Sequence, residues 1–322
     1  MDETVLLAAG EGTRLKPITQ FYPKSLLPIL SVPLLENIIH SLKDQGIRKV
    51  HINVCYLKEN LIRFLRRNDF GVEINISEEN RILGTGGGIG RMRDFIKADD
   101  FIVHNGDIVT NIRIRDAFEF HLKNRAIATL IVELRKGTKD VQLTRHGKIV
   151  DIAGRLGKNG EGLKLFGFTG IAIVNRRIFN FLPKNTFHDI IETYVELITH
   201  GEPVYAFESH NHYWLDIGTK ERYLQVHRDI LVNKKNVFSR MPSDDLTIFI
   251  GEGSCVSKNA LLSGFVSIGK HCIVSDHVKL ENCIVFDNAR LVDGEKYRNC
   301  IISENFVVRA DNHERTEKTS IN

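Results

Sequence analysis

The sequence predicts an α/β fold with a doubly wound, mostly parallel sheet, followed by a smaller domain of repeated six-residue units. Three observations support this prediction. Short apolar runs alternate with helical patterns up to residue 232, a polar stretch follows at 233–246, and a six-residue period begins beyond it. We therefore expect an α/β domain at 1–232, a linker at 233–246, a repeat domain at 247–308 and a polar tail at 309–322.

The first domain contains apolar runs of strand length separated by helical patterns. The expected strands are 4–8, 48–54, 72–76, 101–105, 127–134, 166–174 and 203–208. The expected helices are 34–45, 57–67, 89–97, 114–124, 188–200 and 219–232. Strands that alternate with such helices predict a Rossmann-like sheet covered by helices on both faces. Its ligand site should lie at the carboxyl ends of the strands.

The second domain shows one aliphatic or aromatic residue in every unit of six. These residues are Ile250, Val256, Leu262, Ile268, Val274, Leu280, Phe286 and Val292. One inward-pointing side chain per hexad describes a triangular coil, in which each hexad forms one flat side. The pattern resembles the left-handed parallel β-helix of hexapeptide-repeat proteins, with fewer than three complete turns. Such coils expose sides that stack readily, so we expect a homo-oligomer formed through the β-helix.

The composition excludes several classes of partner. Of the 322 residues, 42% are hydrophobic and 26% are charged, and the net charge is +4, so we expect a sizeable core and no nucleic-acid partner. No apolar run reaches the roughly 18–20 residues of a membrane span, and no signal peptide precedes the first strand. The five cysteines lack a Cys-x-x-Cys pair and are interpreted as buried apolar residues in a reducing compartment. We expect a cytoplasmic protein without a membrane partner.

The densest chemical signal lies at residues 7–28, LAAGEGTRLKPITQFYPKSLLP. Small residues follow the first strand, at Ala8, Ala9, Gly10 and Gly12, where they allow backbone amides to approach a ligand. The segment lacks the Gly-Lys-Ser/Thr of a P-loop and the third glycine of a dinucleotide fingerprint. Exposed amides followed by the cations Arg14 and Lys24 suit a polyphosphate. The alternative is a surface turn with solvated cations.

The run GEGTRLKPIT…PKSLLPI resembles the signature of the sugar-1-phosphate nucleotidylyltransferases, G-x-G-T-R-x-x-P-x-T…P-K-x-L-x-P. Other motifs occur in that family's order, namely LGTGGGI at 83–89, NGDI at 105–108, FTGIAIV at 168–174 and WLDIGT at 214–219. The similarity spans about residues 3–232. It implies an enzyme that joins a nucleoside triphosphate (NTP) to a sugar 1-phosphate and releases pyrophosphate.

The resemblance also implies roles for individual residues. Arg14 would hold the departing pyrophosphate, and Lys24 would neutralise the reacting phosphates. Asp107 and Asp216 each follow an apolar stretch and would hold Mg²⁺, a cation that prefers oxygen ligands; otherwise each caps a turn. The expected nucleotide contacts are Ala8, Ala9, Gly10, Gly12, Thr13, Glu79, Gly84 and Thr85. The expected sugar contacts are Thr169 and Gly170.

The nucleotide base and the sugar are less well defined. A carboxylate at Glu78 or Glu79 could accept from both N1–H and N2–H₂ of guanine, which favours GTP. The triple glycine at 86–88 most resembles guanylyl- and uridylyltransferases that act on mannose-, heptose- or amino-sugar 1-phosphates, and from this resemblance we predict a mannose- or heptose-type 1-phosphate. The alternative is a uridylyl- or thymidylyltransferase that acts on a glucose- or amino-sugar 1-phosphate. Many members carry a Tyr-Gly pair where this chain has Lys139-Asp140, and their Glu-Lys-Pro segment has no clear counterpart here.

Two other classes of protein share these features in part. Longer β-helices often belong to acyltransferases, but fewer than three turns and no extruded loop with a histidine argue against that class. A catalytically silent regulatory subunit should lack one of the four charged residues Arg14, Lys24, Asp107 and Asp216, and all four are present. His210 and His212 alternate along a strand without a third metal ligand nearby, so we expect them to be solvent-facing or stacked.

Overall fold

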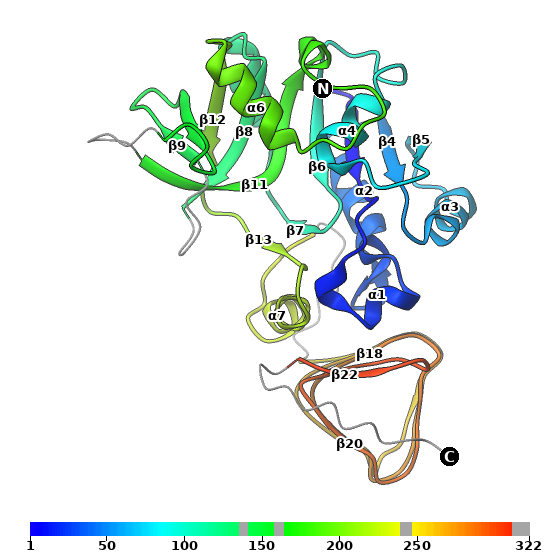
Figure 1. The fold of residues 1–322 in the computed structure, drawn as a ribbon. Helices are drawn as coiled ribbons and strands as arrows, with labels where there is room; N and C mark the ends of the chain where they lie inside the picture. Colours follow the sequence, from blue (N-terminus) through cyan, green and yellow to red (C-terminus); the bar gives the residue numbers. More distant parts are fainter. Residues whose placement is uncertain (135–140, 158–163, 239–246, 311–322) are drawn as a thin grey trace.

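The structure is a computed structural model that describes residues 1–134, 141–157, 164–238 and 247–310. It shows an α/β domain above a triangular coil of strands (Figure 1). Most of the expected linker and tail, at 239–246 and 311–322, lies outside the described residues. None of the helices in the described ranges has the length and apolar character that a membrane crossing requires.

The first domain is built on a large sheet whose central strand is β1 (Glu3–Leu7). On one side β1 pairs with β4 (Lys49–Val54), which in turn pairs with β5 (Glu73–Glu78). On the other side it pairs with β6 (Asp100–Asn105), and all of these pairs are parallel. The strands of this sheet that follow β1 in sequence, β4 and β5, lie on one side of it, and the next strand, β6, lies on the other. The strand order therefore reverses at β1. A crevice is expected outside the carboxyl ends of the strands at such a point.

Beyond β6 the sheet continues through β11 (Lys164–Asn175), β8 (Ala128–Glu133) and β12 (Val204–Glu208). β11 is antiparallel to both β6 and β8, and β12 is parallel to β8. A hairpin of β9 (Val141–Leu143) and β10 (Ile149–Ile152) extends the start of β11. Since β8 and β12 run in the same direction as β6, the mostly parallel sheet that the sequence predicts is confirmed.

Helices cover both faces of this sheet. α2 (Leu34–Asp44), α3 (Lys58–Arg67) and α5 (Ile114–Lys123) pack on one face, and α4 (Gly84–Arg91) and α6 (Ile190–Thr199) pack on the other. Successive side chains of a strand point to opposite faces. Accordingly, Leu6 of β1 lies in the first apolar cluster and Val5 lies in the second.

Short elements connect the sheet to the ligand edge. They are η1 (Thr13–Leu15), α1 (Ile18–Phe21), η2 (Lys24–Leu26), β2 (Pro28–Ile29), β3 (Val32–Pro33), β7 (Ile108–Thr110), η3 (Arg176–Asn180) and β13 (Trp214–Asp216). α7 (Lys220–Leu231) follows β13 and lies beside α1 above the coil (Figure 1).

The glycine run at 84–90 is itself helical, whereas the sequence predicts a helix at 89–97. A Cβ on Gly86 would lie 2.6 Å from Cδ2 of His188, and one on Gly90 would lie 2.7 Å from the carbonyl oxygen of Pro183. Segment 183–190 thus packs directly on the backbone of α4. Glycine lowers intrinsic helix propensity, so the sequence of this segment does not predict a helix there. Tertiary packing stabilises the helix instead.

The second domain is a parallel β-helix with three flat sides. The first side stacks β14 (Ile248–Ile250), the second halves of β16 (Leu261–Ile268) and β18 (Lys279–Val285), and β21 (Cys300–Ile302). The second side stacks β15 (Cys255–Val256), β17 (Ile273–Val274) and β19 (Arg290–Leu291). The third side stacks the first halves of β16 and β18 with β20 (Lys296–Arg298). β22 (Val307–Arg309) then pairs antiparallel with β21.

The coils of the β-helix differ in length by one residue. Ile248 pairs with Val266, eighteen positions later, whereas Val266 pairs with Cys283, seventeen positions later. The inward-facing positions therefore move back by one, from Phe286 to Val285. For the same reason Leu291 is buried inside the coil, whereas Val292 is 61% exposed. The six-residue period predicted from the sequence therefore holds through Leu280 and is wrong from Phe286 on.

None of the five cysteines, all of which lie within the described residues, forms a disulfide. Cys272, Cys283 and Cys300 are buried inside the β-helix, as the sequence predicts. Cys255 is exposed, which corrects that interpretation for this residue, because its side chain points away from the coil on the second flat side.

Candidate active site

A cavity of about 340 Å³ opens at the carboxyl ends of β1, β4 and β6. Leu7, Asn53 and Asn105 are register partners at these three strand ends. The other lining residues are Ala8, Ala9, Gly10, Gly12, Thr13, Arg14, Lys24, Ser25, Ile82, Gly84, Thr85, Gly106, Asp107 and Gly218. The cavity therefore occupies the crevice expected from the strand order. It brings together most of the residues that the sequence singles out.

A buried chain of hydrogen bonds holds the loop that follows β1. The backbone N–H of Ala8 donates to Oδ1 of Asn53 over 2.8 Å, and Nδ2 of Asn53 donates to Oε1 of Glu79 over 2.8 Å. The backbone N–H of Leu83 donates to the other carboxylate oxygen of Glu79 over 3.0 Å. Asn53 is a site residue that our sequence analysis missed. The available signal was a polar residue at the carboxyl end of an apolar strand.

The position of Glu79 contradicts the expected contact with a guanine base. Its side chain is 1% exposed, and both of its oxygens accept hydrogen bonds from the protein. Burial is the main reason that the pKa of Glu79 is raised above its ordinary value. Glu78 does not replace it, because that carboxylate lies on the exposed side of β5 and contacts Lys58. The carboxylate at position 79 therefore supports the cavity wall and does not face a ligand.

Arg14 and Gly12 shape one wall of the cavity. Gly12 adopts a left-handed backbone with φ of 66°, and a Cβ there would lie 2.9 Å from Cγ2 of Thr19 and 3.3 Å from Cβ of Lys24. The Arg14 guanidinium lies against Gly218, where a Cβ would come within 2.7 Å of Nη2. Within the described residues Arg14 forms no ion pair, so its charge is available to the cavity.

Lys24 and Asp107 form an ion pair at the cavity, with Nζ 2.5 Å from Oδ2. The side chain of Lys24 is 14% exposed and that of Asp107 is 31% exposed. Asp107 is positioned by Gly106, whose N–H donates to the carbonyl oxygen of Leu7 over 2.8 Å. A Cβ on Gly106 would lie 2.6 Å from that same oxygen, so glycine permits this close approach.

Asp216 is brought beside Asp107 by the antiparallel pair of β7 and β13. The N–H of Ile217 donates to the carbonyl oxygen of Asp107 over 3.0 Å. Oδ1 of Asp216 accepts from the N–H of Gly218 over 3.0 Å, and Oδ2 contacts Arg222. Asp216 is thus adjacent to the cavity, although it does not line the cavity in the present arrangement.

Asp107 and Asp216 would supply only part of the ligand shell of a Mg²⁺ ion. Within the described ranges no group of three or more His, Cys, Asp or Glu side chains could hold a metal. Asp107, in the turn before β7, and Asp216, at the end of β13, nevertheless supply hard oxygen ligands beside a cavity large enough for phosphates. Mg²⁺ usually takes one or two protein carboxylates and completes its shell with phosphate oxygens and water. This donor set fits that pattern.

The expected sugar contacts have different environments from those predicted. Thr169 is fully buried, its hydroxyl donates to the carbonyl oxygen of Ile131 over 2.7 Å, and its own carbonyl accepts from Nε1 of Trp214. Its side chain therefore cannot contact a sugar in the cavity. Gly170, with φ of 78°, lies against Asn105, because a Cβ there would come within 2.6 Å of Nδ2. Lys139 and Asp140 lie outside the described residues.

The glycine-rich run contributes only its first residues to the cavity. Gly84 and Thr85 line the cavity, and their contact with a nucleotide stays a prediction. The hydroxyl of Thr85 accepts from the N–H of Ile190 over 2.9 Å and donates to Asp189 over 3.2 Å. That hydroxyl therefore fastens α4 to the start of α6.

The two alternating histidines contact different carboxylates. Nε2 of His212 lies 2.6 Å from Glu133, and its Nδ1 lies 3.0 Å from the hydroxyl of Ser209. His210 lies 3.6 Å from Glu208. The side chain of His210 is 64% exposed, as the sequence predicts, whereas that of His212 is 7% exposed and contacts Glu133, so the predicted solvent-facing or stacked environment is wrong for His212.

This chain is similar to known proteins in sequence and in fold. Residues 3–148 match the nucleotidyl transferase family model. The chain is 27% identical to a UTP–glucose-1-phosphate uridylyltransferase of Synechocystis, over 91% of this chain and 85% of the relative. It is also 27% identical to a mannose-1-phosphate guanylyltransferase of Mycobacterium tuberculosis, over 91% of this chain and 82% of the relative.

Solved structures show the same fold at lower sequence identity. HddC from Yersinia pseudotuberculosis, complexed with GMP-PN, superposes with a TM-score of 0.60 and 23% identity over 70% of this chain and 98% of HddC. A putative glucose-1-phosphate thymidylyltransferase from Bacillus anthracis gives a TM-score of 0.62 and 21% identity over 74% and 98% of the two chains. Fold, cavity and matched family together define a nucleotidyl transferase.

Within that class the relatives matched over most of the chain are named for sugar 1-phosphates. The chain is thus similar over most of its length to sugar-1-phosphate nucleotidylyltransferases, and it is an enzyme of that type.

Proposed function

We propose that this enzyme transfers a nucleoside monophosphate from GTP to a mannose- or heptose-type sugar 1-phosphate and releases pyrophosphate. The observation that carries the proposal is the cavity at β1, which combines backbone amides, Arg14, and the Lys24–Asp107 pair. Fixed amides and cations around one cavity suit a triphosphate better than an uncharged ligand.

The reaction requires positioning and charge neutralisation more than proton transfer. A phosphate oxygen of the sugar 1-phosphate attacks the α-phosphorus of the NTP. The bond from the α-phosphorus to the oxygen that bridges to the β-phosphorus breaks, and pyrophosphate leaves with both electrons of that bond. The attacking phosphate is already ionised at neutral pH, so no general base is needed.

Arg14 and Lys24 would neutralise different phosphates in this reaction. Arg14 lies on the loop after β1 and has no carboxylate partner within the described residues, so it is suited to hold the departing pyrophosphate. Lys24 is held between Gly12 and Asp107 and would neutralise the reacting phosphates. The ammonium group of Lys24 has three N–H donors, so it can contact phosphate oxygens as well as Asp107.

Asp107 and Asp216 would hold a Mg²⁺ ion, the cofactor that we propose for this site. The ion would supply positive charge to phosphate oxygens that the side chains cannot reach. Arg222 and the N–H of Gly218 contact Asp216 and hold its carboxylate in place. Removal of divalent cations with EDTA should abolish turnover, and readdition of Mg²⁺ should restore it.

The choice of GTP now rests on similarity to guanylyltransferases, since Glu79 is unavailable to the base. A relative named for UTP and glucose 1-phosphate matches an equal share of the chain. A uridylyltransferase that acts on a glucose-type 1-phosphate is therefore the second candidate.

The deciding experiment is pyrophosphate release with four NTPs and a panel of hexose 1-phosphates. Fastest turnover with GTP and a manno-configured sugar phosphate would support the proposal. Fastest turnover with UTP or dTTP would replace the base assignment and leave the class of reaction unchanged. NTP binding without turnover for every pair would indicate a catalytically silent subunit.

Lys24→Ala tests the assigned role of the lysine. The loss of one charge at the reacting phosphates should lower kcat by about 10²-fold or more. Arg63, on the solvent-facing side of α3, offers a matched control for the loss of a cation. An enzyme with Lys24→Ala and near-normal kcat would refute the assignment.

The expected homo-oligomer formed through the β-helix stays a prediction. Sedimentation velocity of the full chain would test it, and a monomer at micromolar concentration would contradict it.

A further inference from the structure

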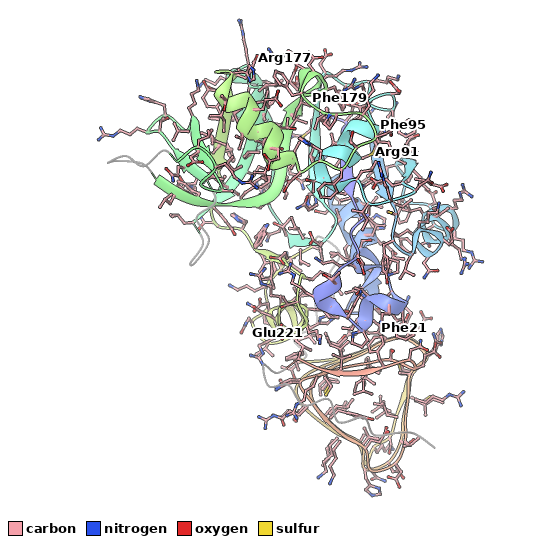
Figure 2. All side chains as sticks on the ribbon, viewed as in Figure 1. Phe21, Arg91, Phe95, Arg177, Phe179 and Glu221 are labelled. Atoms are coloured by element: carbon pink, nitrogen blue, oxygen red, sulfur yellow. The ribbon has the colours of Figure 1, made fainter. Side chains whose placement is uncertain are left out.

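The segment that carries Lys24 lies against the β-helix. In Figure 1, α1 sits directly above the flat side formed by β18 and β22. The Tyr22 ring packs edge-on against Phe286, with centroids 5.1 Å apart, and against Phe306 at 6.2 Å. Phe21 lies 5.8 Å from Phe306, and Figure 2 shows Phe21 at the junction of the two domains. Aromatic side chains of the β-helix thus contact the chain just before Lys24.

The far end of the same segment is held by α7. The Tyr223 hydroxyl donates to the carbonyl oxygen of Pro28 over 2.5 Å, and Nε2 of His227 accepts from the N–H of Leu30 over 3.1 Å. The Tyr223 ring also packs edge-on against Phe286, at 6.3 Å. Phe286 therefore contacts both the segment and the helix that holds it.

The backbone that connects the Tyr22 contacts to Lys24 is short and conformationally restricted. Only Pro23, whose φ is −55°, stands between Tyr22 and Lys24. Lys24 begins η2, whose turn is closed by hydrogen bonds from the N–H of Leu26 to Pro23 and from the N–H of Leu27 to Lys24. A shift of the Tyr22 ring would therefore be passed to the backbone of Lys24.

We propose that Phe286 and Phe306 are positioning residues through which the β-helix sets the ammonium group of Lys24 for catalysis. The inference rests on the proposed role of Lys24 and assigns to the β-helix a part in the same reaction. Phosphoryl transfer depends on positioning, and a displacement of about 1 Å can cost about 10²-fold in rate. Phe286 faces the segment because the shorter coil moves Val285 inward in its place.

The first test replaces each ring in the full-length enzyme, as Phe286→Leu and Phe306→Leu. Leucine keeps an apolar side chain and removes the aromatic contacts with Tyr22. We expect kcat to fall about tenfold and KM for the NTP to change less than twofold. Phe265→Leu is the matched control: Phe265 is also buried in this interface, but its ring contacts Arg228 of α7 at 5.5 Å. The control should keep kcat within twofold.

The second test asks whether the effect acts through Lys24. In a Lys24→Gln background, Phe286→Leu should lower the residual kcat by less than twofold. The same tenfold loss in both backgrounds would show a general structural effect and overturn the proposal. A wild-type kcat for both single leucine variants would also overturn it.

Amide hydrogen exchange supplies a readout that does not depend on turnover. Phe286→Leu should speed exchange of the Leu26 and Leu27 amides at least fivefold and leave strand β6 unchanged. Unchanged exchange at these amides would overturn the proposal. If Lys24→Gln alone keeps full activity, the catalytic role of the lysine fails, whereas the exchange result still reports whether the β-helix orders its segment.

Discussion

Two glycine-rich segments border the cavity, and their glycines serve different purposes. In the loop after β1, Gly10 has no atom within 4 Å of an added Cβ, so it leaves space at the cavity. In α4, an added Cβ on Gly86 would meet His188 at 2.6 Å, so glycine there makes room for the protein itself. Similar composition therefore marks a loop that lines the cavity in one place and tight packing of the chain on a helix in the other.

The chain near each segment is held by a buried titratable side chain, and burial shifts the pKa values of these two side chains in opposite directions. The chain that continues from the first loop is held at Leu30, whose N–H donates to His227, and burial lowers the pKa of His227 to about 4. The second begins at Leu83, whose N–H donates to Glu79, and burial raises the pKa of that carboxyl. In each case burial favours the neutral form of the anchor.

Gly12→Ala should have the largest effect on the loop after β1. The new Cβ would require a left-handed alanine and would press on Lys24 and Thr19. We expect kcat/KM to fall on the order of 10²-fold or more, as for a misplaced catalytic group. Steady-state pyrophosphate release measures this effect. A fall of less than threefold would mean that Gly12 does not fix the position of Lys24.

Acidification should destabilise the anchor of the same segment. The unfolded chain protonates His227 near pH 6.5 and the folded chain near pH 4, so between these values the unfolded state binds more protons. Stability therefore falls as pH drops from 6.5 toward 4, with up to about 3 kcal/mol from this residue. Urea unfolding at pH 7 and pH 4.5 should show a smaller loss for His227→Gln than for wild type. An equal loss in both proteins would contradict the assignment.

Gly86→Ala tests the packing role of the second segment. The added methyl group would overlap His188, and overpacking of this kind costs about 1–3 kcal/mol. Urea unfolding should show a loss of about 2 kcal/mol, and KM for the NTP should stay within threefold because Gly86 does not line the cavity.

Gly10→Ala is the matched control for that substitution. Because nothing lies within 4 Å of the added Cβ, its free energy of unfolding should change by less than about 0.5 kcal/mol. Its KM for the NTP should rise several-fold, since the methyl group enters the cavity. Equal loss of stability in both variants would remove the distinction between the two segments.

Thr85→Val should destabilise the protein less than Gly86→Ala. Valine removes the acceptor of the Ile190 N–H, and the loss of such a hydrogen bond costs about 1 kcal/mol. Thr85→Ser keeps the hydroxyl and should match wild type within about 0.5 kcal/mol. A stability for Thr85→Val equal to wild type would show that α6 does not depend on this contact.

The sequence predicted the fold well where a single periodicity governs a segment. The strands around β1 and the helix at 34–44 follow from alternating or helical apolar patterns, because their burial is decided by one face. The sequence predicted a helix at 89–97, whereas α4 spans Gly84–Arg91. Its glycines pack against segment 183–190, which is distant in sequence, so the local pattern does not reveal the helix. The β-helix period failed after Leu280, because one residue is missing between Glu281 and Cys283 relative to the preceding coil.

The site was predicted best where residues are adjacent in sequence. The loop at 8–14, Lys24 and Asp107 all reach the cavity, because a strand end presents its next residues at the sheet edge. Glu79 and Thr169 were wrongly expected to face ligands, because a motif does not reveal burial. Asn53 was missed because its partners, Ala8 and Glu79, come from other strands.

The one-residue difference between coils has a consequence for how such chains vary in length. Insertion of a single residue into a flat side would exchange inward and outward positions for the remainder of that side. Insertion of a whole coil of seventeen or eighteen residues would keep every later side chain on its own face. Among proteins of this architecture, tolerated length changes inside the β-helix should therefore be whole coils or single residues at a corner, as at Gly264.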